Sequence, residues 1–96
     1  MLQAIKLAMG ITATEYDEEI CGLIRAAKND LRIAGVESEL SNDPLILQAV
    51  KTYCRAHFRS PGDYDRLKAA YDEQKAQLMV ATGYTKYKEV SPGGAR

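Results

Sequence analysis

The sequence of 96 residues lacks a net charge and a long hydrophobic run, and it contains only one histidine. Its 13 lysine and arginine residues balance its 13 aspartate and glutamate residues. A neutral chain has no strongly basic surface for nucleic acid, and it does not repel copies of itself. The charge balance therefore argues against a simple nucleic-acid-binding domain and permits self-association.

The sequence also contains no stretch with the hydropathy expected of a membrane span or a signal peptide. No stretch approaches the roughly 18–20 apolar residues that cross a bilayer. Gln3 and Lys6 interrupt the apolar start of the chain, which has no basic segment before it, so it does not read as a signal peptide. Cys21 and Cys54 lie within apolar helical patterns. We expect an intracellular protein with two buried free thiols, with a single disulfide as the alternative.

The stretch D-P-L-I-L-Q-A-V-K-T-Y-C-R-A-H-F, residues 43–58, predicts a helix with a defined start. Asp43 can cap the free backbone N–H groups, and Pro44 suits the first helical position because it needs no N–H partner there. The apolar stripe covers about half of the helix circumference, more than a one-sided surface helix needs. Its members are Ile46, Leu47, Val50, Tyr53, Cys54, His57 and Phe58. We expect a central helix packed on more than one neighbour.

Two helices are predicted before it. The first covers residues 1–9 and ends at Gly10, and the second begins with Thr14 as its N-cap and ends at Gly35. Gly22 lies inside the second helix, where glycine costs about 1 kcal/mol relative to alanine. A close helix–helix contact and simple tolerance are both open as explanations of this glycine.

A fourth helix is predicted after the turn at residues 60–62, with Asp63 as its cap and Gly83 at its end. Its solvent face offers ion pairs three residues apart, Asp65 with Lys68 and Asp72 with Lys75. No internal repeat is visible. The sequence therefore predicts an all-α fold, a small bundle of about four helices with an extended C-terminal tail, within one small domain.

The chain changes character after residue 83, so we divide it into a helical domain at 1–83 and a C-terminal arm at 84–96. The arm reads Y-T-K-Y-K-E-V-S-P-G-G-A-R, with strand-forming residues but no helical stripe. A frayed terminus is one interpretation. The other is an arm that orders on a partner by adding a strand to a sheet edge. The candidate docking residues are Tyr84, Lys86, Tyr87, Lys88 and Val90.

Cys54 and His57 stand three positions apart on one helical face. This spacing is compatible with a pair of zinc ligands or with a cysteine nucleophile and its histidine base. A zinc site needs four ligands, or three and a water, and the sequence adds only one distant cysteine. A cysteine nucleophile also needs a histidine held by a third group. We interpret the pair as a packed core cysteine and a partly buried histidine, with a thiol or metal enzyme as the alternative.

Other catalytic and ligand-binding patterns give no support for an enzyme. Gly93 and Gly94 lie at the end of the arm and not between a strand and a helix, so they do not form a phosphate loop. Asp17, Glu18 and Glu19 lack the spacing of a calcium loop and suit a helix N-terminus. We therefore expect no enzyme activity, cofactor or metal.

Lys51, Arg55 and Arg59 recur every four residues and form a basic ridge beside the apolar stripe of the central helix. A solvated face is one interpretation of this basic ridge, and phosphate contact is a second. A third is a head-to-tail contact in which the ridge of one copy meets acids of the next, such as Asp17 and Glu18. These five residues are our candidates for a subunit interface or a channel-facing surface.

Residues 43–58 and the following run D-Y-D-R-L-K-A-A-Y-D-E-Q-K-A-Q-L resemble the small head–tail connector proteins of long-tailed bacteriophages. These proteins are also described as DNA-packaging or head-completion proteins. The upstream pieces I-K-L-A-M-G-I and D-E-E-I-C-G-L-I-R-A-A-K-N-D-L-R-I-A-G fit the same family, in which a short first helix precedes a longer one that ends at a glycine. The resemblance covers residue 1 to about residue 84 and rests on apolar positions and helix boundaries.

The resemblance implies a structural protein of a phage or prophage. Family members form a homo-oligomeric ring beneath the portal of the filled capsid, extend the DNA channel and offer a docking surface to the tail side. The implied partners are further copies of the chain, the portal protein, and a tail-side connector or tail terminator, with packaged DNA nearby and no membrane. The implied location is the virion head–tail junction, and the host cytoplasm during assembly.

A small helical DNA-binding regulator is the second hypothesis, because the central and fourth helices could imitate a helix-turn-helix. The zero net charge and the core-like face of the central helix weigh against it. Another protein-interaction domain belongs to the same alternative.

Overall fold

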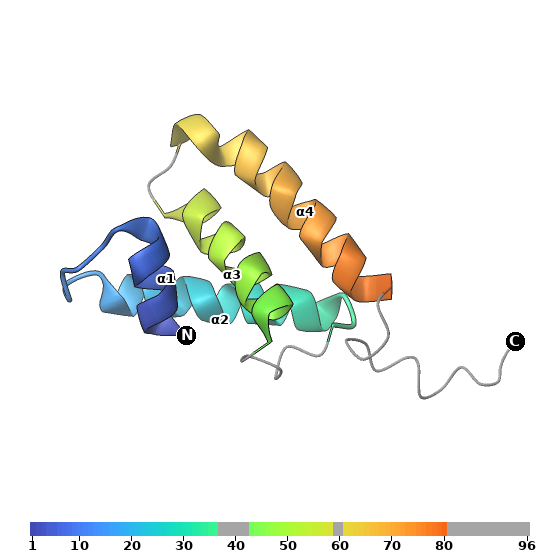
Figure 1. Ribbon diagram of the computed structural model, residues 1–96, viewed down its shortest axis with the longest axis horizontal. Coiled ribbons are helices and arrows are strands. Elements are labelled where there is room, and N and C mark those ends of the chain that lie inside the picture. The colour runs from blue at the N-terminus through green and yellow to red at the C-terminus, as the bar shows by residue number, and fades with distance from the viewer. Residues whose placement is uncertain (37–42, 59–60, 81–96) are drawn as a thin grey trace, which may run out of the picture.

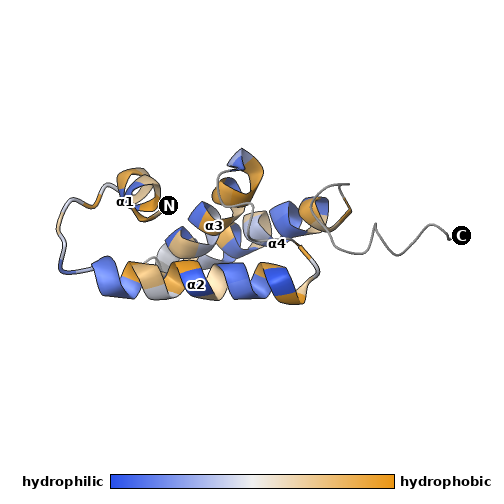
Figure 2. Ribbon diagram, turned by 90° about the horizontal axis from the view of Figure 1, so that it is seen from below, coloured by the Kyte–Doolittle hydropathy of each residue, from blue (hydrophilic) through white to orange (hydrophobic). Residues whose placement is uncertain are grey.

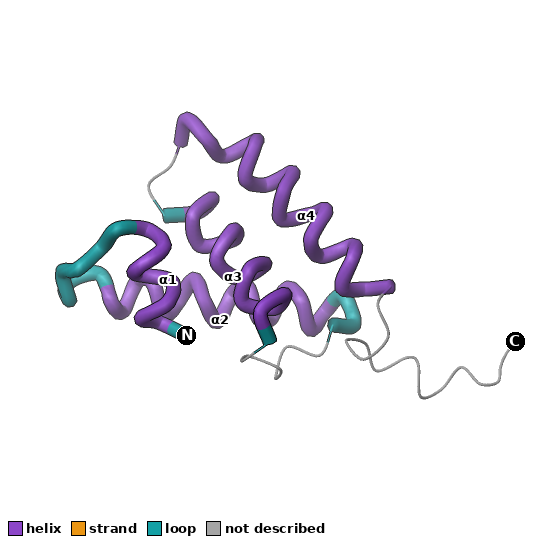
Figure 3. The backbone as a smooth tube through the Cα atoms, viewed as in Figure 1, coloured by secondary structure: helices purple, strands orange, loops and turns teal. Residues whose placement is uncertain are grey.

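The computed structural model describes residues 1–36, 43–58 and 61–80 (Figure 1). All regular elements in these ranges are helical (Figure 3). They are α1 (Leu2–Met9), α2 (Asp17–Ile33), α3 (Pro44–His57), a 3₁₀ turn (Pro61–Asp63) and α4 (Tyr64–Val80). The predicted all-α fold of about four helices is therefore confirmed.

Helix α3 is central, because it packs against α1, α2 and α4. Helices α3 and α4 run side by side in opposite directions, and α2 crosses behind α3 (Figure 1). The short α1 lies toward the N-terminal end of α2. This arrangement differs from a helix-turn-helix, whose two helices meet at about 90–120°.

The hydrophobic core draws on all four helices. Orange and blue positions alternate along α2, which buries one stripe and leaves the other in solvent (Figure 2). The largest fully buried side chains are Ile5, Ile20, Leu31, Val36, Ile46, Val50 and Cys54. Tyr71 and Leu78 of α4 complete this cluster. The core therefore explains why α1, too short to be stable alone, holds its place.

Glycine ends α1 and α2 as the sequence predicts. Gly10 and Gly35 have positive φ angles of 72° and 94°, which glycine adopts without a Cβ penalty. After α2, Val36 N–H donates to Leu31 O at 2.8 Å and Gly35 N–H donates to Arg32 O at 2.9 Å. This is the Schellman pattern, in which the apolar residue after the glycine packs back on the helix.

The beginning of α3 is confirmed and that of α2 is not. Asp43 Oδ1 accepts a hydrogen bond of 2.8 Å from Leu45 N–H, as expected of an N-cap before proline. Helix α2 begins at Asp17, and Thr14 is not its cap. Thr14 instead accepts a turn hydrogen bond of 3.1 Å from Asp17 N–H through its backbone carbonyl.

Two further expectations are resolved by contacts. A Cβ atom at Gly22 would meet nothing within 4 Å, so simple tolerance, and not a close helix–helix contact, explains this glycine. The predicted ion pairs on α4 are wrong in their partners. Lys68 Nζ lies 2.8 Å from Asp72 Oδ2, and Lys75 Nζ lies 3.0 Å from Asp30 Oδ2 on α2. Helix packing brings Asp30 within reach of Lys75, which sequence spacing alone does not reveal.

Candidate interaction surfaces

The described part of the basic ridge lies on the outer side of α3. Arg55 is exposed and Lys51 is half-buried. Arg59 lies outside the described residues. Of the two described ridge residues, Arg55 is therefore the one better placed to meet another molecule.

A surface groove of about 340 Å³ lies beside Arg55. It is formed where the end of α1, the end of α3 and the start of α4 meet, and its lining is Ala8, Met9, Ile11, Arg55, Phe58, Asp63 and Leu67. Asp63 also lies 3.4 Å from Arg66 in an exposed ion pair. The lining thus combines apolar side chains with one exposed cation, Arg55, and one exposed carboxylate, Asp63.

The two acidic candidates at the start of α2 have different surroundings. Asp17 Oδ1 lies 2.7 Å from Nζ of Lys6, a buried side chain of α1. Glu18 is exposed. The Asp17 carboxylate is thus paired with a residue of its own chain, whereas the Glu18 side chain faces solvent.

Lys6 is a structural position that the sequence reasoning passed over. It stands four residues after Leu2 and three before Met9, so it falls within the apolar stripe of α1. The signal that could have predicted the ion pair is a lysine on the apolar face of one helix, followed after Gly10 by an acidic residue, Asp17, at the start of the next helix. The buried ion pair fixes α1 against the start of α2.

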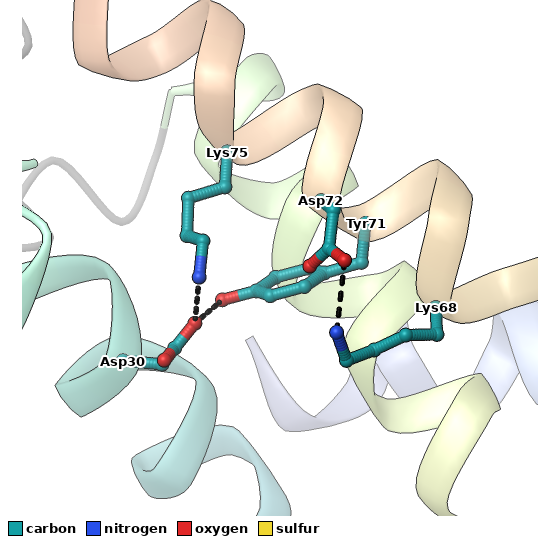
Figure 4. Close-up of polar contacts among 5 residues, drawn as sticks. All are labelled: Asp30, Lys68, Tyr71, Asp72 and Lys75. Carbon is teal, nitrogen blue, oxygen red and sulfur yellow. Dashed lines mark hydrogen bonds and ion pairs between the residues drawn. The ribbon is translucent and has the colours of Figure 1, made fainter.

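A second polar cluster joins α2 to α4 (Figure 4). Asp30 Oδ2 accepts a hydrogen bond of 2.6 Å from the Tyr71 hydroxyl and one of 3.0 Å from Lys75 Nζ. Burial raises the pKa of Asp30, but the hydrogen bonds from Tyr71 and Lys75 outweigh it, so the pKa lies below its ordinary value. Burial, and then the bond to Asp30, raise the pKa of Tyr71. The cluster keeps a carboxylate ionised between two helices.

One end of the molecule exposes four large apolar side chains, which we call the apolar end: Ile33, Leu45, Met79 and Val80. They come from the last turns of α2 and α4 and the first turn of α3, which lie toward the same end in Figure 1. Ile33 is 82% exposed and Val80 is 83% exposed. Beside them lies a groove of about 140 Å³ between α3 and α4, lined by Leu45, Gln48, Gln74, Gln77 and Leu78.

Cys54 and His57 do not form a reactive pair. Cys54 is fully buried, and burial raises the pKa of its thiol to about 12. The expectation of a partly buried His57 is wrong, because its side chain is exposed at the last residue of α3. The ring of His57 lies 4.3 Å from that of Tyr53 and 5.5 Å from that of Tyr64, measured between ring centroids. Phe58 turns inward in its place and packs edge-on against Tyr16.

Both cysteines are free thiols, with Cys54 buried and Cys21 half-buried. Within residues 1–36, 43–58 and 61–80, no three histidine, cysteine, aspartate or glutamate side chains gather as metal ligands. In the same ranges, no helix combines the length and hydropathy of a membrane span. The arm candidates Tyr84, Lys86, Tyr87, Lys88 and Val90 lie outside the described residues.

The comparisons with known proteins give one finding. A family model described as "Phage connector protein" matches residues 1–85, a range that includes all four helices. No curated protein and no solved structure matches the chain.

Proposed function

The chain belongs to the phage connector protein family, and we propose that it is the head–tail connector subunit that forms a ring beneath the portal. The ring extends the DNA channel and offers its far side to a tail-side connector or tail terminator. The observation that carries this proposal is the extent of the family match, which includes α1, α2, α3 and α4, the helices of the described residues. The site of action is then the head–tail junction of the virion.

The work of such a subunit is geometric, and the described surfaces suit it. The core is closed within one chain, so the helical domain can fold before it assembles. Exposed charges of opposite sign, Arg55 on α3 and Glu18 on α2, lie on different helices. In a heterologous contact, one patch of each subunit binds a different patch of the next. Such a contact closes into a ring when a whole number of equal rotations between neighbouring copies completes one full turn.

The basic ridge provides the first test. We propose that Arg55 and Arg59 meet acids of a neighbouring copy or line the channel. The variant Arg55→Glu with Arg59→Glu should then reduce assembly on portals or DNA retention in filled capsids. Its helical circular dichroism should be unchanged, since Arg55 is exposed. Arg25→Glu, an exposed reversal on α2, is the matched control. Normal assembly and infectivity of the double variant would remove the ridge from the proposal.

The division into a helical domain at 1–83 and an arm at 84–96 is also a proposal. We assign the arm, with Tyr84, Lys86, Tyr87, Lys88 and Val90, to docking on the portal or an adjacent ring. Deleting residues 84–96 should abolish portal binding and leave the helical domain folded, because the core cluster found within residues 1–36, 43–58 and 61–80 precedes the arm. A truncated chain that still sediments with portals would defeat this assignment.

A further inference from the structure

We propose that α1 is a latch, which opens from and closes onto the rest of the chain as a unit while α2, α3 and α4 stay folded. The latch comprises residues 1–15. Its lock is the ion pair between Lys6 Nζ and Asp17 Oδ1, which lie 2.7 Å apart. This is a property of the free chain and is independent of the proposed function.

Helix α1 has little stability of its own. It contains 8 residues, and an isolated helix shorter than about 12 residues is marginal in water. Its N-cap residue, Met1, makes no side-chain capping hydrogen bond, and its first turn contains no acidic residue. Neither capping nor the helix dipole therefore stabilises its start. Its closed position depends on its contacts with α2 and α3.

The connection between α1 and α2 is exposed, and its far end is anchored. Residues 12–15 are exposed, and this stretch runs outside the helices in both views (Figure 1 and Figure 2). Gly10 ends α1, and the ring of Tyr16 packs edge-on against Phe58 of α3, with 5.6 Å between ring centroids. The path of the chain between Gly10 and Tyr16 can therefore change without moving α2.

The contacts that close the latch are few and give a small net gain. Ile5 is fully buried in the core. The Lys6 side chain is 4% exposed, so closure takes its ammonium group out of water. The desolvation of a buried ion pair offsets much of its Coulombic attraction. Opening returns both ions to water, and we therefore expect the open state to be a populated minor state.

The other three helices are joined by contacts that do not involve α1. Tyr71 of α4 donates a hydrogen bond of 2.6 Å to Asp30 of α2, and its ring lies 5.2 Å from that of Tyr53 of α3, measured between centroids. Val50 of α3 and Leu78 of α4 are buried in the same core cluster. These helices can therefore remain packed when α1 opens.

Opening of the latch would change the surface beside Arg55. Helix α1 and the residues after it supply Ala8, Met9 and Ile11 to the lining of the groove of about 340 Å³ there. Opening removes this wall and uncovers the part of the core that Ile5 fills. A molecule bound in the groove contacts the closed state alone and so favours it.

Hydrogen–deuterium exchange of the full-length wild-type chain, followed by NMR, tests the latch. The amides from Ile5 to Ile11 should share one protection factor, at least about tenfold below that of the core amides of α3. Their protection should change little in urea below the unfolding transition, because opening exposes little surface. Protection equal to that of α3 would overturn the proposal. So would protection that rises steadily along α1, since that is the result of fraying.

Two variants test the lock. In Asp17→Asn, closure buries the Lys6 ammonium without its counter-charge, so the α1 amides should lose at least a further tenfold, roughly, of their protection. The amides of α2, α3 and α4 should stay protected. Lys6→Met buries no charge and should open the latch less. Asp63→Asn, which removes an exposed ion pair with Arg66, is the control and should leave α1 unchanged. Greater opening in Lys6→Met than in Asp17→Asn would overturn the assignment of the lock.

Discussion

The Tyr71 hydroxyl of α4 donates a hydrogen bond of 2.6 Å to the Asp30 carboxylate of α2, 41 residues earlier in the chain. The same carboxylate oxygen accepts from Lys75 Nζ at 3.0 Å (Figure 4). Tyr71 is buried and its ring packs edge-on against Tyr53 of the central helix. One side chain therefore ties the outermost helix both to the core and to α2.

Removing only the hydroxyl isolates this bond. Tyr71→Phe should lower the free energy of unfolding by about 1–2 kcal/mol, because a hydrogen bond to a charged group contributes more than a neutral one. Urea unfolding followed by circular dichroism measures the change. Tyr64→Phe, which also removes a hydroxyl from α4, is the control and should have a smaller effect. Equal losses would show that the bond to Asp30 adds nothing to stability.

The Asp30 carboxylate predicts a pH dependence with a definite sign. Its pKa in the folded chain lies below its ordinary value of 3.8, so the unfolded chain binds the proton more readily. The stabilisation is therefore present above about pH 4 and is lost as the pH falls through the lowered pKa. The difference in unfolding free energy between the wild type and Asp30→Asn should shrink between pH 6 and pH 2.5. A difference that is constant over this range would contradict the assignment.

The buried pair between Lys6 and Asp17 predicts an unequal response to losing either partner. Asp17→Asn leaves a buried ammonium group without its counter-charge, which should cost about 3 kcal/mol. Lys6→Met keeps the aliphatic stem and leaves a carboxylate that is one-third exposed, so it should cost less than about 1.5 kcal/mol. Chemical denaturation measures both. A larger loss in Lys6→Met would overturn the argument, because the buried charge would not be the costly element.

Thiol reactivity separates the structural interpretation of Cys54 from a catalytic one. Burial raises the pKa of Cys54 to about 12, which leaves very little thiolate at pH 8. Native Cys54 should react with iodoacetamide at least about a hundredfold more slowly than Cys54 in the urea-unfolded chain. Cys21, which is half-buried, should react first in the native protein. Fast labelling of native Cys54 would reopen the thiol-enzyme alternative.

The sequence was sufficient for the helices because their signals are local. Asp43 and Pro44 mark the start of α3, and the glycines at positions 10 and 35 mark helix ends through their positive φ angles. These features depend on the chain within a few residues of each position. The apolar stripe of α3 also predicted its central place, since a stripe that covers half the circumference requires several neighbours.

The polar contacts were not predictable in the same way, because they depend on helix packing. The spacing in the sequence predicts a pair between Lys75 and Asp72, yet α4 packs so that Lys75 reaches Asp30 on α2. In the sequence, Lys6 only interrupts an apolar segment, and the packing of α1 brings it to Asp17. His57 fell on the apolar stripe but closes the helix at the surface. Of the candidate interface residues, Arg55 and Glu18 are exposed as assembly requires, and Asp17 is occupied within the chain.

The central proposal, a ring subunit that docks on the portal, is tested most directly by co-sedimentation of the full-length chain with purified portal assemblies. Light scattering gives the mass of the free chain in the absence of portals. The account predicts stoichiometric binding to portals, whether the free chain is a monomer or already a ring. A chain that stays in the supernatant at concentrations well above those of the portal, and that instead shifts duplex DNA at moderate salt, would contradict it.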